Sequence, residues 1–154
     1  MKNYRSFLIS FMFMALVSCQ PKQKTAPFDK KMVETEVLQF MDSLIVAFNS
    51  VSAENVFNYF LHTDEFVVAT QGRLIVNPNA LLDTMKVHLA VMEKQETKNE
   101  MDKIFVITKD AAVISTSKIV TLTFKSGGEV TMPYALTMLL VKREGEWKIA
   151  HYHN

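Results

Sequence analysis

The chain of 154 residues lacks several features that would place it in a special class of protein. It has a single cysteine, Cys19, so no disulfide can form within the chain. Its formal net charge is only +1 and no block of like charges occurs, so we expect no nucleic-acid partner. It has neither an internal repeat nor a low-complexity run. The composition, 49% hydrophobic and 21% charged, is that of one globular domain.

The apolar run near the N-terminus is too short to cross a membrane. It spans residues 7–17 and is interrupted only by Ser10, whereas a spanning helix needs about 20 residues. Lys2 and Arg5 precede it, and a short basic start before a short apolar core is typical of a signal peptide. Removal of residues 1–18 would leave 15 basic and 16 acidic side chains, a net charge of −1.

The apolar run ends in Leu16-Val17-Ser18-Cys19. These four residues resemble the bacterial lipobox, in which a leucine and small residues precede an obligatory cysteine. The resemblance implies that Cys19 receives a diacylglyceryl group, that the chain is cut after Ser18, and that the new N-terminus is acylated. Several acyl chains would anchor the protein stably in a lipid bilayer. The alternative is an ordinary secretory signal in which Cys19 is incidental.

Residues 20–27, QPKQKTAP, are expected to form a tether because they are polar, contain two prolines and have no apolar periodicity. Fully extended, they reach about 26–29 Å, so the domain would stay close to the bilayer. Gln20 is not the aspartate that retains enteric lipoproteins in the inner membrane. By that resemblance we expect an exported, lipid-anchored protein on the outer membrane, facing the periplasm. The predicted parts are a signal peptide (1–18), a lipidated tether (19–27) and a domain (28–154).

Three helices are predicted in the N-terminal half of this domain. The first follows the cap residue Asp29 and has an apolar face formed by Val33, Val37, Phe40, Leu44 and Phe48. Ser52 is the expected cap of a second, shorter helix with apolar repeats as far as Leu61. Asn77-Pro78 is a typical start of a third helix, on which one face is expected to hold Leu81, Met85, His88 and Met92.

The remaining segments have β-strand character. Two short strands, 65–70 and 73–76, flank a turn at Gln71-Gly72. The charged residues 93–103 are expected to leave the end of the third helix and lead into a strand. Four long antiparallel strands with short turns between them then cover residues 103–108, 111–124, 129–142 and 146–152.

This order of elements resembles the nuclear-transport-factor-two-like superfamily, which includes SnoaL-like cyclases and ketosteroid isomerases. Residues 145–153, GEWKIAHYH, are similar to the closing strand of SnoaL-like domains, and residues 60–64, FLHTD, resemble the segment after their second helix. The resemblance implies an α+β, cystatin-like cone, with three helices packed in a strongly curved antiparallel sheet. A pocket lies at the open end of such a cone, and the outer sheet face often dimerises. Its members include enzymes, ligand binders and association modules, so the fold does not determine the function.

The last predicted hairpin supplies candidate ligand-binding residues. If Glu144-Gly145 is its turn, simple alternation places four side chains on one sheet face, namely Tyr134, Met138, His151 and His153. Such a face indicates a pocket wall, although half-buried core residues would give the same pattern. Further candidates lie on the second helix, in the turns and on the third helix, and they are Tyr59, His62, Arg73 and His88.

The two terminal histidines also have the spacing of two metal ligands on a strand. A structural or catalytic metal needs three or four protein ligands. Only His62 and Asp64 remain to complete such a set, and nothing in the sequence brings them within reach. We therefore expect neither a metal nor another cofactor.

Asp64 is the best carboxylate for acid–base chemistry. In a mechanism of the ketosteroid-isomerase type, a carboxylate moves a proton while a tyrosine holds the enolate oxygen. Asp64, Tyr134 and His151 could serve in such a mechanism in an isomerase, cyclase or dehydratase. The segment around Asp64 also has the character of a polar turn, and Asp102 is expected to face solvent.

No nucleophile-and-base pair stands out, so the sequence argues against an enzyme. The first hypothesis is a membrane-tethered domain that binds a small apolar or amphipathic molecule. A homodimer is compatible with this hypothesis. The acid–base enzyme is the second hypothesis. A non-catalytic, partner-binding or structural lipoprotein is the third.

Overall fold

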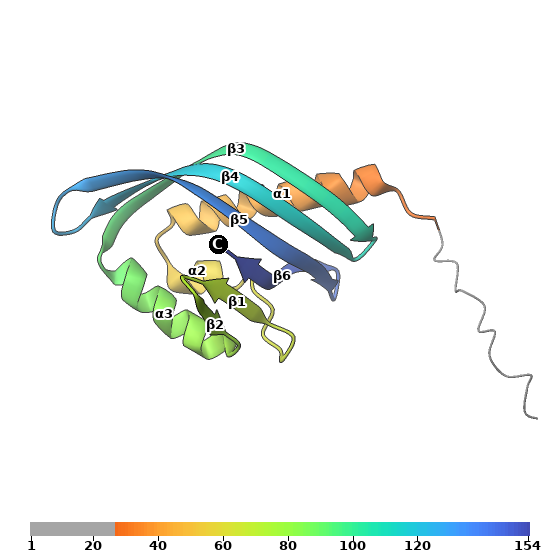
Figure 1. The fold of residues 1–154 in the computed structure, drawn as a ribbon, viewed down its shortest axis with the longest axis horizontal. Helices are drawn as coiled ribbons and strands as arrows, with labels where there is room; N and C mark the ends of the chain where they lie inside the picture. The colour runs from red at the N-terminus through yellow and green to blue at the C-terminus, as the bar shows by residue number, and fades with distance from the viewer. Residues whose placement is uncertain (1–26) are drawn as a thin grey trace, which may run out of the picture.

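The computed structural model describes residues 27–154, so the predicted signal peptide, Cys19 and nearly all of the tether lie outside the described residues. Figure 1 shows a mixed α+β fold, which confirms the predicted fold class. The elements are α1 (Lys30–Asn49), α2 (Ala53–Phe57), β1 (Val67–Thr70), β2 (Arg73–Ile75), α3 (Pro78–Ala90), β3 (Met92–Thr108), β4 (Ala111–Phe124), β5 (Glu129–Arg143) and β6 (Glu146–His153). Within this part of the chain, no helix combines the length and the apolar character that a membrane crossing requires.

The helices begin at the predicted cap residues. The side-chain oxygens of Asp29, Ser52 and Asn77 each accept a hydrogen bond from a backbone N–H two or three residues further on, at 2.9, 3.2 and 2.9 Å. Such bonds satisfy donors that the first helical turn leaves without partners. The second helix is shorter than the apolar repeats in the sequence predict. It ends at Phe57, and a few residues later Phe60 forms an isolated β-bridge to β6.

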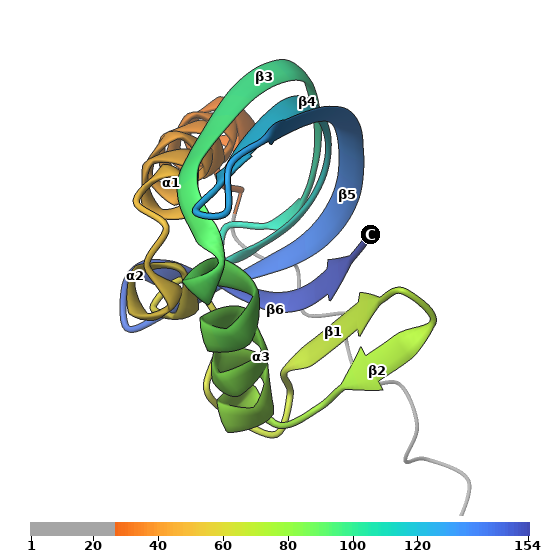
Figure 2. The same cartoon turned by 90° about the vertical axis from the view of Figure 1, so that its left-hand side faces the viewer.

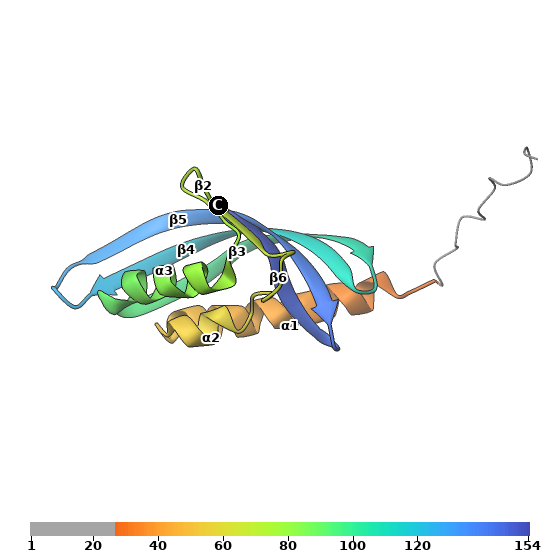
Figure 3. The same cartoon turned by 90° about the horizontal axis from the view of Figure 1, so that it is seen from below.

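All six strands belong to one sheet, in the order β2-β1-β6-β5-β4-β3. The β1 strand runs parallel to β6, and every other neighbouring pair is antiparallel. Figure 2 shows that the long strands β3, β4 and β5 bend strongly around α1, and Figure 3 shows the three helices on the same side of the sheet. The curved sheet is open, and its concave face forms the cone.

The third helix ends earlier than predicted. Its last residue is Ala90, and Met92 already begins β3, so the prediction that residues 93–103 lead out of a helix was wrong. These charged residues belong to a strand of 17 residues at the edge of the sheet. Charged side chains suit an edge strand because they oppose pairing with another chain. Only Leu81 of α3 is buried, and His88 is exposed, so the predicted apolar face of this helix is largely absent.

A β-bulge reverses the predicted orientation of the last strand. The pairs Lys142–Trp147 and Leu140–Ile149 form as expected, but the register then shifts so that Leu139 pairs with the residue after Ala150. One extra residue in a strand moves every following side chain to the other face. The two terminal histidines are therefore exposed and Tyr152 is buried, and the prediction that both histidines share a face with Tyr134 and Met138 was wrong.

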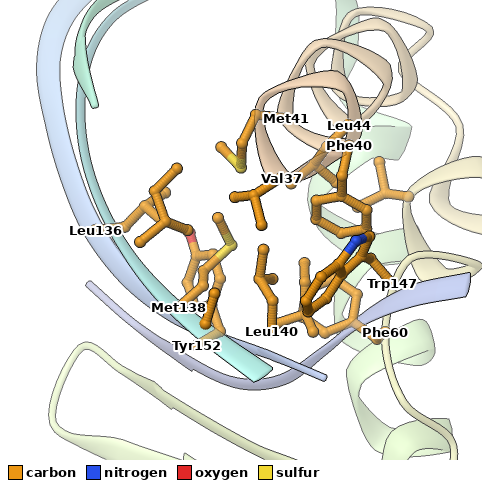
Figure 4. Close-up of a cluster of buried hydrophobic side chains, with 14 of the residues drawn as sticks. Val37, Phe40, Met41, Leu44, Phe60, Leu136, Met138, Leu140, Trp147 and Tyr152 are labelled. Atoms are coloured by element: carbon orange, nitrogen blue, oxygen red, sulfur yellow. The ribbon is translucent and has the colours of Figure 1, made fainter. Parts of the chain in front are cut away.

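The core fills the cone between α1 and the concave face of the sheet. In Figure 4, Val37 and Met41 of α1 point toward Leu136, Met138 and Leu140 of β5. The predicted apolar face of α1 forms the helical side of this core, with Phe48 at its partly buried margin. These buried apolar side chains stabilise the cone by removing hydrocarbon from water.

Candidate functional site

A cavity of about 180 Å³ lies beside this core, between α1 and the concave face of the sheet. We call it the cone pocket, and its lining residues are Met41, Leu44, Ile45, Phe48, Met92, Gln95, Thr97, Lys118, Val120, Leu122, Met132, Tyr134, Leu136, Met138 and Tyr152. Most of this wall is apolar, with a few polar groups, which is the usual composition of a small-molecule site. Its volume suits a molecule of about one ring, since an apolar cavity of about 150 Å³ holds benzene.

Two tyrosines form one polar point of the pocket. The hydroxyl groups of Tyr134 and Tyr152 are hydrogen-bonded to each other. Burial raises the pKa of Tyr152, and the neighbouring Tyr134 raises it further. Burial also raises the pKa of Tyr134, against an opposing effect of hydrogen bonds from Tyr152 and Asn154. Both rings therefore stay neutral at ordinary pH, and they offer hydrogen bonds to a ligand without a charge.

Lys118 is the second polar point. It lies on β4 directly opposite Tyr134 of β5, and strand alternation turns both side chains into the cone. Only 5% of Lys118 is exposed, and its Nζ donates to the Asn99 side-chain oxygen at 2.9 Å. Burial lowers the pKa of Lys118, and the charges of Asp102 and Asp42 act in the opposite direction.

A second bulge positions the partner of Lys118. The register of β3 shifts between Asn99 and Met101, so that Asn99 and Asp102 both turn toward the inside of the cone. Asn99 Nδ2 donates to Asp102 Oδ2 at 2.7 Å, which aims the Asn99 oxygen at Lys118. Asp102 is half-buried and its Oδ1 has no hydrogen-bond partner among residues 27–154, so the prediction that Asp102 faces solvent was wrong.

A larger hollow of about 740 Å³ lies outside the cone, between α1, α2 and the β5–β6 hairpin. We call it the hairpin groove. At its floor, Glu36 Oε2 accepts from Lys142 Nζ at 2.5 Å and from Trp147 Nε1 at 3.0 Å. The Lys142 hydrogen bond and then the Trp147 hydrogen bond hold the pKa of Glu36 below its usual value. These contacts join α1 to the hairpin.

The residues predicted for acid–base chemistry do not come together. Tyr134 lies in the cone pocket, whereas Asp64 is exposed in the turn before β1 and His151 is exposed on the opposite face of the sheet from the pocket. A general base must come within hydrogen-bond reach of the proton that it moves. The structure therefore does not form the arrangement of Asp64, Tyr134 and His151 that the second hypothesis requires.

The predicted ligand-binding residues are divided between several surfaces. Tyr134 and Met138 line the cone pocket. Tyr59 lines the hairpin groove, where its hydroxyl donates to the Ser43 carbonyl at 3.1 Å. The other five, all exposed and outside the cone pocket, are His62, Arg73, His88, His151 and His153. His62 stacks on the ring of Phe57 with 4.1 Å between centroids.

Two residues that form the polar points of the pocket, Lys118 and Tyr152, were not among the candidates predicted from the sequence. Lys118 shares its strand alternation with Ile114 and Val120, and this period of two was a usable signal that it faces the core. Tyr152 was missed because the bulge at Ala150 reverses the face on which it lies. Between residues 27 and 154, no group of three His, Cys, Asp or Glu side chains could hold a metal ion.

Comparison with known proteins identifies the same fold. Residues 37–154 match the SnoaL-like domain family. A nuclear transport factor 2 (NTF2-like) superfamily protein from Salmonella enterica serovar Typhimurium has a TM-score of 0.72 and 14% identity, over 81% of this chain and 91% of that chain. A comparison with curated proteins finds no match.

Two further structures illustrate how varied this fold is. One, provisionally described as a scytalone dehydratase from Novosphingobium aromaticivorans, has a TM-score of 0.71 and 13% identity, over 80% of this chain and 83% of that chain. The other, provisionally described as a calcium/calmodulin dependent protein kinase II association domain from Xanthomonas campestris, has a TM-score of 0.67 and 19% identity, over 77% and 83%. At such identities the similarity establishes the fold alone. The resemblance predicted from the sequence is confirmed, and the chain belongs to the SnoaL-like domain family.

Proposed function

We propose that residues 28–154 form a domain that binds a small apolar or amphipathic molecule in the cone pocket, and that a lipid on Cys19 holds this domain at a membrane. The observation that carries the proposal is the pocket itself, an apolar cavity of about 180 Å³ with a few polar groups on its wall. Its methionines, Met41, Met92, Met132 and Met138, suit a site that adapts to its ligand, because their side chains are flexible and polarisable.

Binding is favoured over catalysis by the chemistry of the pocket wall. No carboxylate and no imidazole is among its described lining residues. The two tyrosines have raised pKa values and therefore do not exchange protons readily near neutral pH. The wall supplies hydrogen-bond donors and apolar surface, which is what recognition needs.

Native mass spectrometry tests the proposal on residues 28–154, which contain every residue of the hydrophobic core. After purification from the periplasm without detergent, we expect extra mass that leaves on activation. A Leu122→Trp substitution would fill the pocket and remove the extra mass. Thr123→Trp is the matched control, because the next residue along β4 points to the other face of the sheet and does not line the pocket.

The same experiment can contradict the proposal. Equal extra mass on the wild-type domain and the Leu122→Trp variant would show that the molecule binds elsewhere. A bare wild-type chain that also fails to bind added one-ring compounds would remove the pocket as a ligand site.

The membrane tether is tested separately in whole cells. We expect a radiolabelled fatty acid to be incorporated into the full chain and lost in a Cys19→Ser variant. We also expect the labelled protein to fractionate with the outer membrane and to be protected from protease in intact cells. Labelling that survives Cys19→Ser would contradict the proposed anchor, and cleavage by external protease would contradict the periplasmic orientation.

The outer face of the sheet supports a further proposal, a homodimer. Phe105, Val113 and Leu139 lie side by side on neighbouring strands and turn away from the cone, and Phe105 is 70% exposed. A contiguous apolar row of this kind is typical of an interaction surface. We expect residues 28–154 to sediment as a dimer and Phe105→Lys to sediment as a monomer. Glu93→Lys, on the same strand outside this row, should leave the dimer intact.

A further inference from the structure

We propose that the cone pocket takes a small carboxylate-bearing molecule, about one ring in size, whose carboxylate binds Lys118. This inference rests on the proposed small-molecule function and goes further, because it names the chemical class of the ligand. It also assigns to Lys118 a binding role that the histidines were expected to have.

Lys118 has an incomplete set of hydrogen-bond partners. An ammonium group has three N–H donors, and among residues 27–154 the Lys118 ammonium has one hydrogen-bond acceptor, the neutral Asn99 amide oxygen at 2.9 Å. The six ion pairs in this part of the chain do not include Lys118. A buried charge without a counter-charge is costly, and a ligand carboxylate would supply both the charge and the missing acceptors.

Two acidic groups influence the charge of Lys118. Asp42 of α1 and Asp102 of β3 favour its charged form, although neither forms an ion pair with Lys118 among residues 27–154. Asp102 instead accepts from the Asn99 amide at 2.7 Å and so orients the amide oxygen toward Lys118. The two carboxylates therefore help to keep the ammonium protonated, and its remaining donors stay available.

The hydrogen-bonded pair Tyr134–Tyr152 lies beside Lys118 in the pocket. Tyr134 is its direct cross-strand neighbour, and side chains in such positions are about 5 Å apart at Cβ. The hydroxyls of Tyr134 and Tyr152 share one hydrogen bond, so the pair retains one O–H that it does not use between its members. A carboxylate has about four acceptor sites and can take bonds from both an ammonium and a hydroxyl.

The apolar part of the pocket wall favours a ligand that is apolar apart from its carboxylate. Leu44, Val120 and Leu136 present hydrocarbon to the cavity, and Lys118 is the one charged side chain among its described lining residues. A dianion or a highly hydroxylated molecule would leave polar groups without partners against this surface. An aromatic ring or short chain with a single carboxylate matches both the volume and the polarity of the site.

Isothermal titration calorimetry with a pair of probes tests the inference. Phenylacetate and phenylacetamide have nearly the same shape and differ in charge. We expect residues 28–154 to bind the acid at least 10-fold more tightly than the amide. A Lys118→Met variant should lose this preference and keep its affinity for the amide. The control Lys142→Met removes a lysine that is already paired with Glu36, outside the pocket, and should keep the preference.

Each outcome has a distinct meaning. Equal affinity of the wild-type domain for acid and amide would overturn the role of Lys118 while leaving the pocket as a binding site, and this comparison does not depend on any variant folding. A preference that persists in both Lys118→Met and Lys118→Gln would overturn it as well. If neither probe binds, and Leu122→Trp carries the same extra mass as the wild type in native mass spectrometry, the proposed function itself fails together with this inference.

Discussion

The cone pocket and the hairpin groove each contain a lysine beside aromatic side chains, but the two lysines have opposite surroundings. In the groove, Lys142 contacts Glu36 at 2.5 Å and lies 5.1 Å from the centre of the Trp147 ring. In the pocket, Lys118 is more deeply buried and its acceptor is a neutral amide. The groove is the larger hollow, about 740 Å³ against about 180 Å³.

The difference shows that the size of a hollow does not identify a binding site. The charges at the floor of the hairpin groove already satisfy one another, and their contacts connect α1 with the β5–β6 hairpin. The buried charge in the cone pocket keeps donors that nothing in the described chain uses. A satisfied charge stabilises the fold, whereas an incompletely satisfied one is available for a ligand.

The largest expected effect concerns the groove floor. Trp147 is 8% exposed and belongs to the core as well as to the groove. Trp147→Ala should lower the free energy of unfolding by about 3–5 kcal/mol, because it removes a large buried ring and leaves a cavity. Urea denaturation followed by circular dichroism measures this loss. A change below 1 kcal/mol would show that the groove floor is not part of the structural framework.

The two lysines give a sharper test because their effects should have opposite signs. In the ligand-free domain, Lys118→Met should raise the free energy of unfolding by about 1 kcal/mol, since it replaces an unpaired buried charge by an apolar chain of similar volume. Lys142→Met should lower it by about 1 kcal/mol, because Glu36 and Trp147 lose their partner. Two changes of the same sign, measured by urea denaturation at pH 7, would show that the two lysines do not differ in this way.

The pH dependence follows from the direction of the Lys118 pKa shift. Burial lowers the pKa of Lys118 below its ordinary value of 10.5. Below this lowered pKa, the buried charge lowers the free energy of unfolding by its full amount. This loss disappears as the pH rises toward 10.5, because the folded protein releases the Lys118 proton at a lower pH than the unfolded chain does. The stability advantage of Lys118→Met should therefore shrink over that interval.

A smaller effect is expected at Glu36, whose side chain is one-third exposed. Its hydrogen bonds from Lys142 and Trp147 lower its pKa from the ordinary value of 4.5. The resulting stability is present above pH 4.5 and is lost as the pH falls through the lowered pKa. Glu36→Gln should therefore cost about 0.5–1 kcal/mol at pH 7, allowing for solvent screening. This difference from the wild type should close below pH 4.5 in acid titrations of stability.

The smallest contrast is between two tyrosine hydroxyls. Tyr152→Phe should cost about 1 kcal/mol, because the half-buried Tyr134 hydroxyl loses its hydrogen bond to Tyr152. Tyr59→Phe should cost about 0.5 kcal/mol, since its bond to the Ser43 carbonyl is exposed to solvent. Thermal unfolding of the two variants measures both changes. A larger loss at Tyr59 would place the more important hydrogen bond in the groove.

Much of the fold could be predicted because local chemistry determines where its elements begin and end. The caps Asp29, Ser52 and Asn77 are local signals, and each forms the expected bond. The hairpin turn at Glu144-Gly145 has positive φ at both residues, 53° and 86°, as a tight turn between twisted antiparallel strands requires. The predicted end of α3 was wrong because Met92 continues the helical spacing of apolar residues by chance. In the structure this residue already belongs to β3.

The order of the elements, the apolar face of α1 and the resemblance to SnoaL-like domains could all be read from local features of the chain. Which side chains enter the cone depends on tertiary packing, because two single-residue bulges, near Asn99 and at Ala150, each reverse the alternation of a strand. A bulge depends on how a strand packs against distant neighbours, and the local sequence does not show that packing. The same reason explains the contrast between Lys118 and Lys142, which the sequence shows simply as two lysines in β-strands. Only the folded chain brings Glu36 into contact with Lys142. Among the described residues, Lys118 has no counter-charge within ion-pair distance, and its acceptor is the Asn99 amide oxygen.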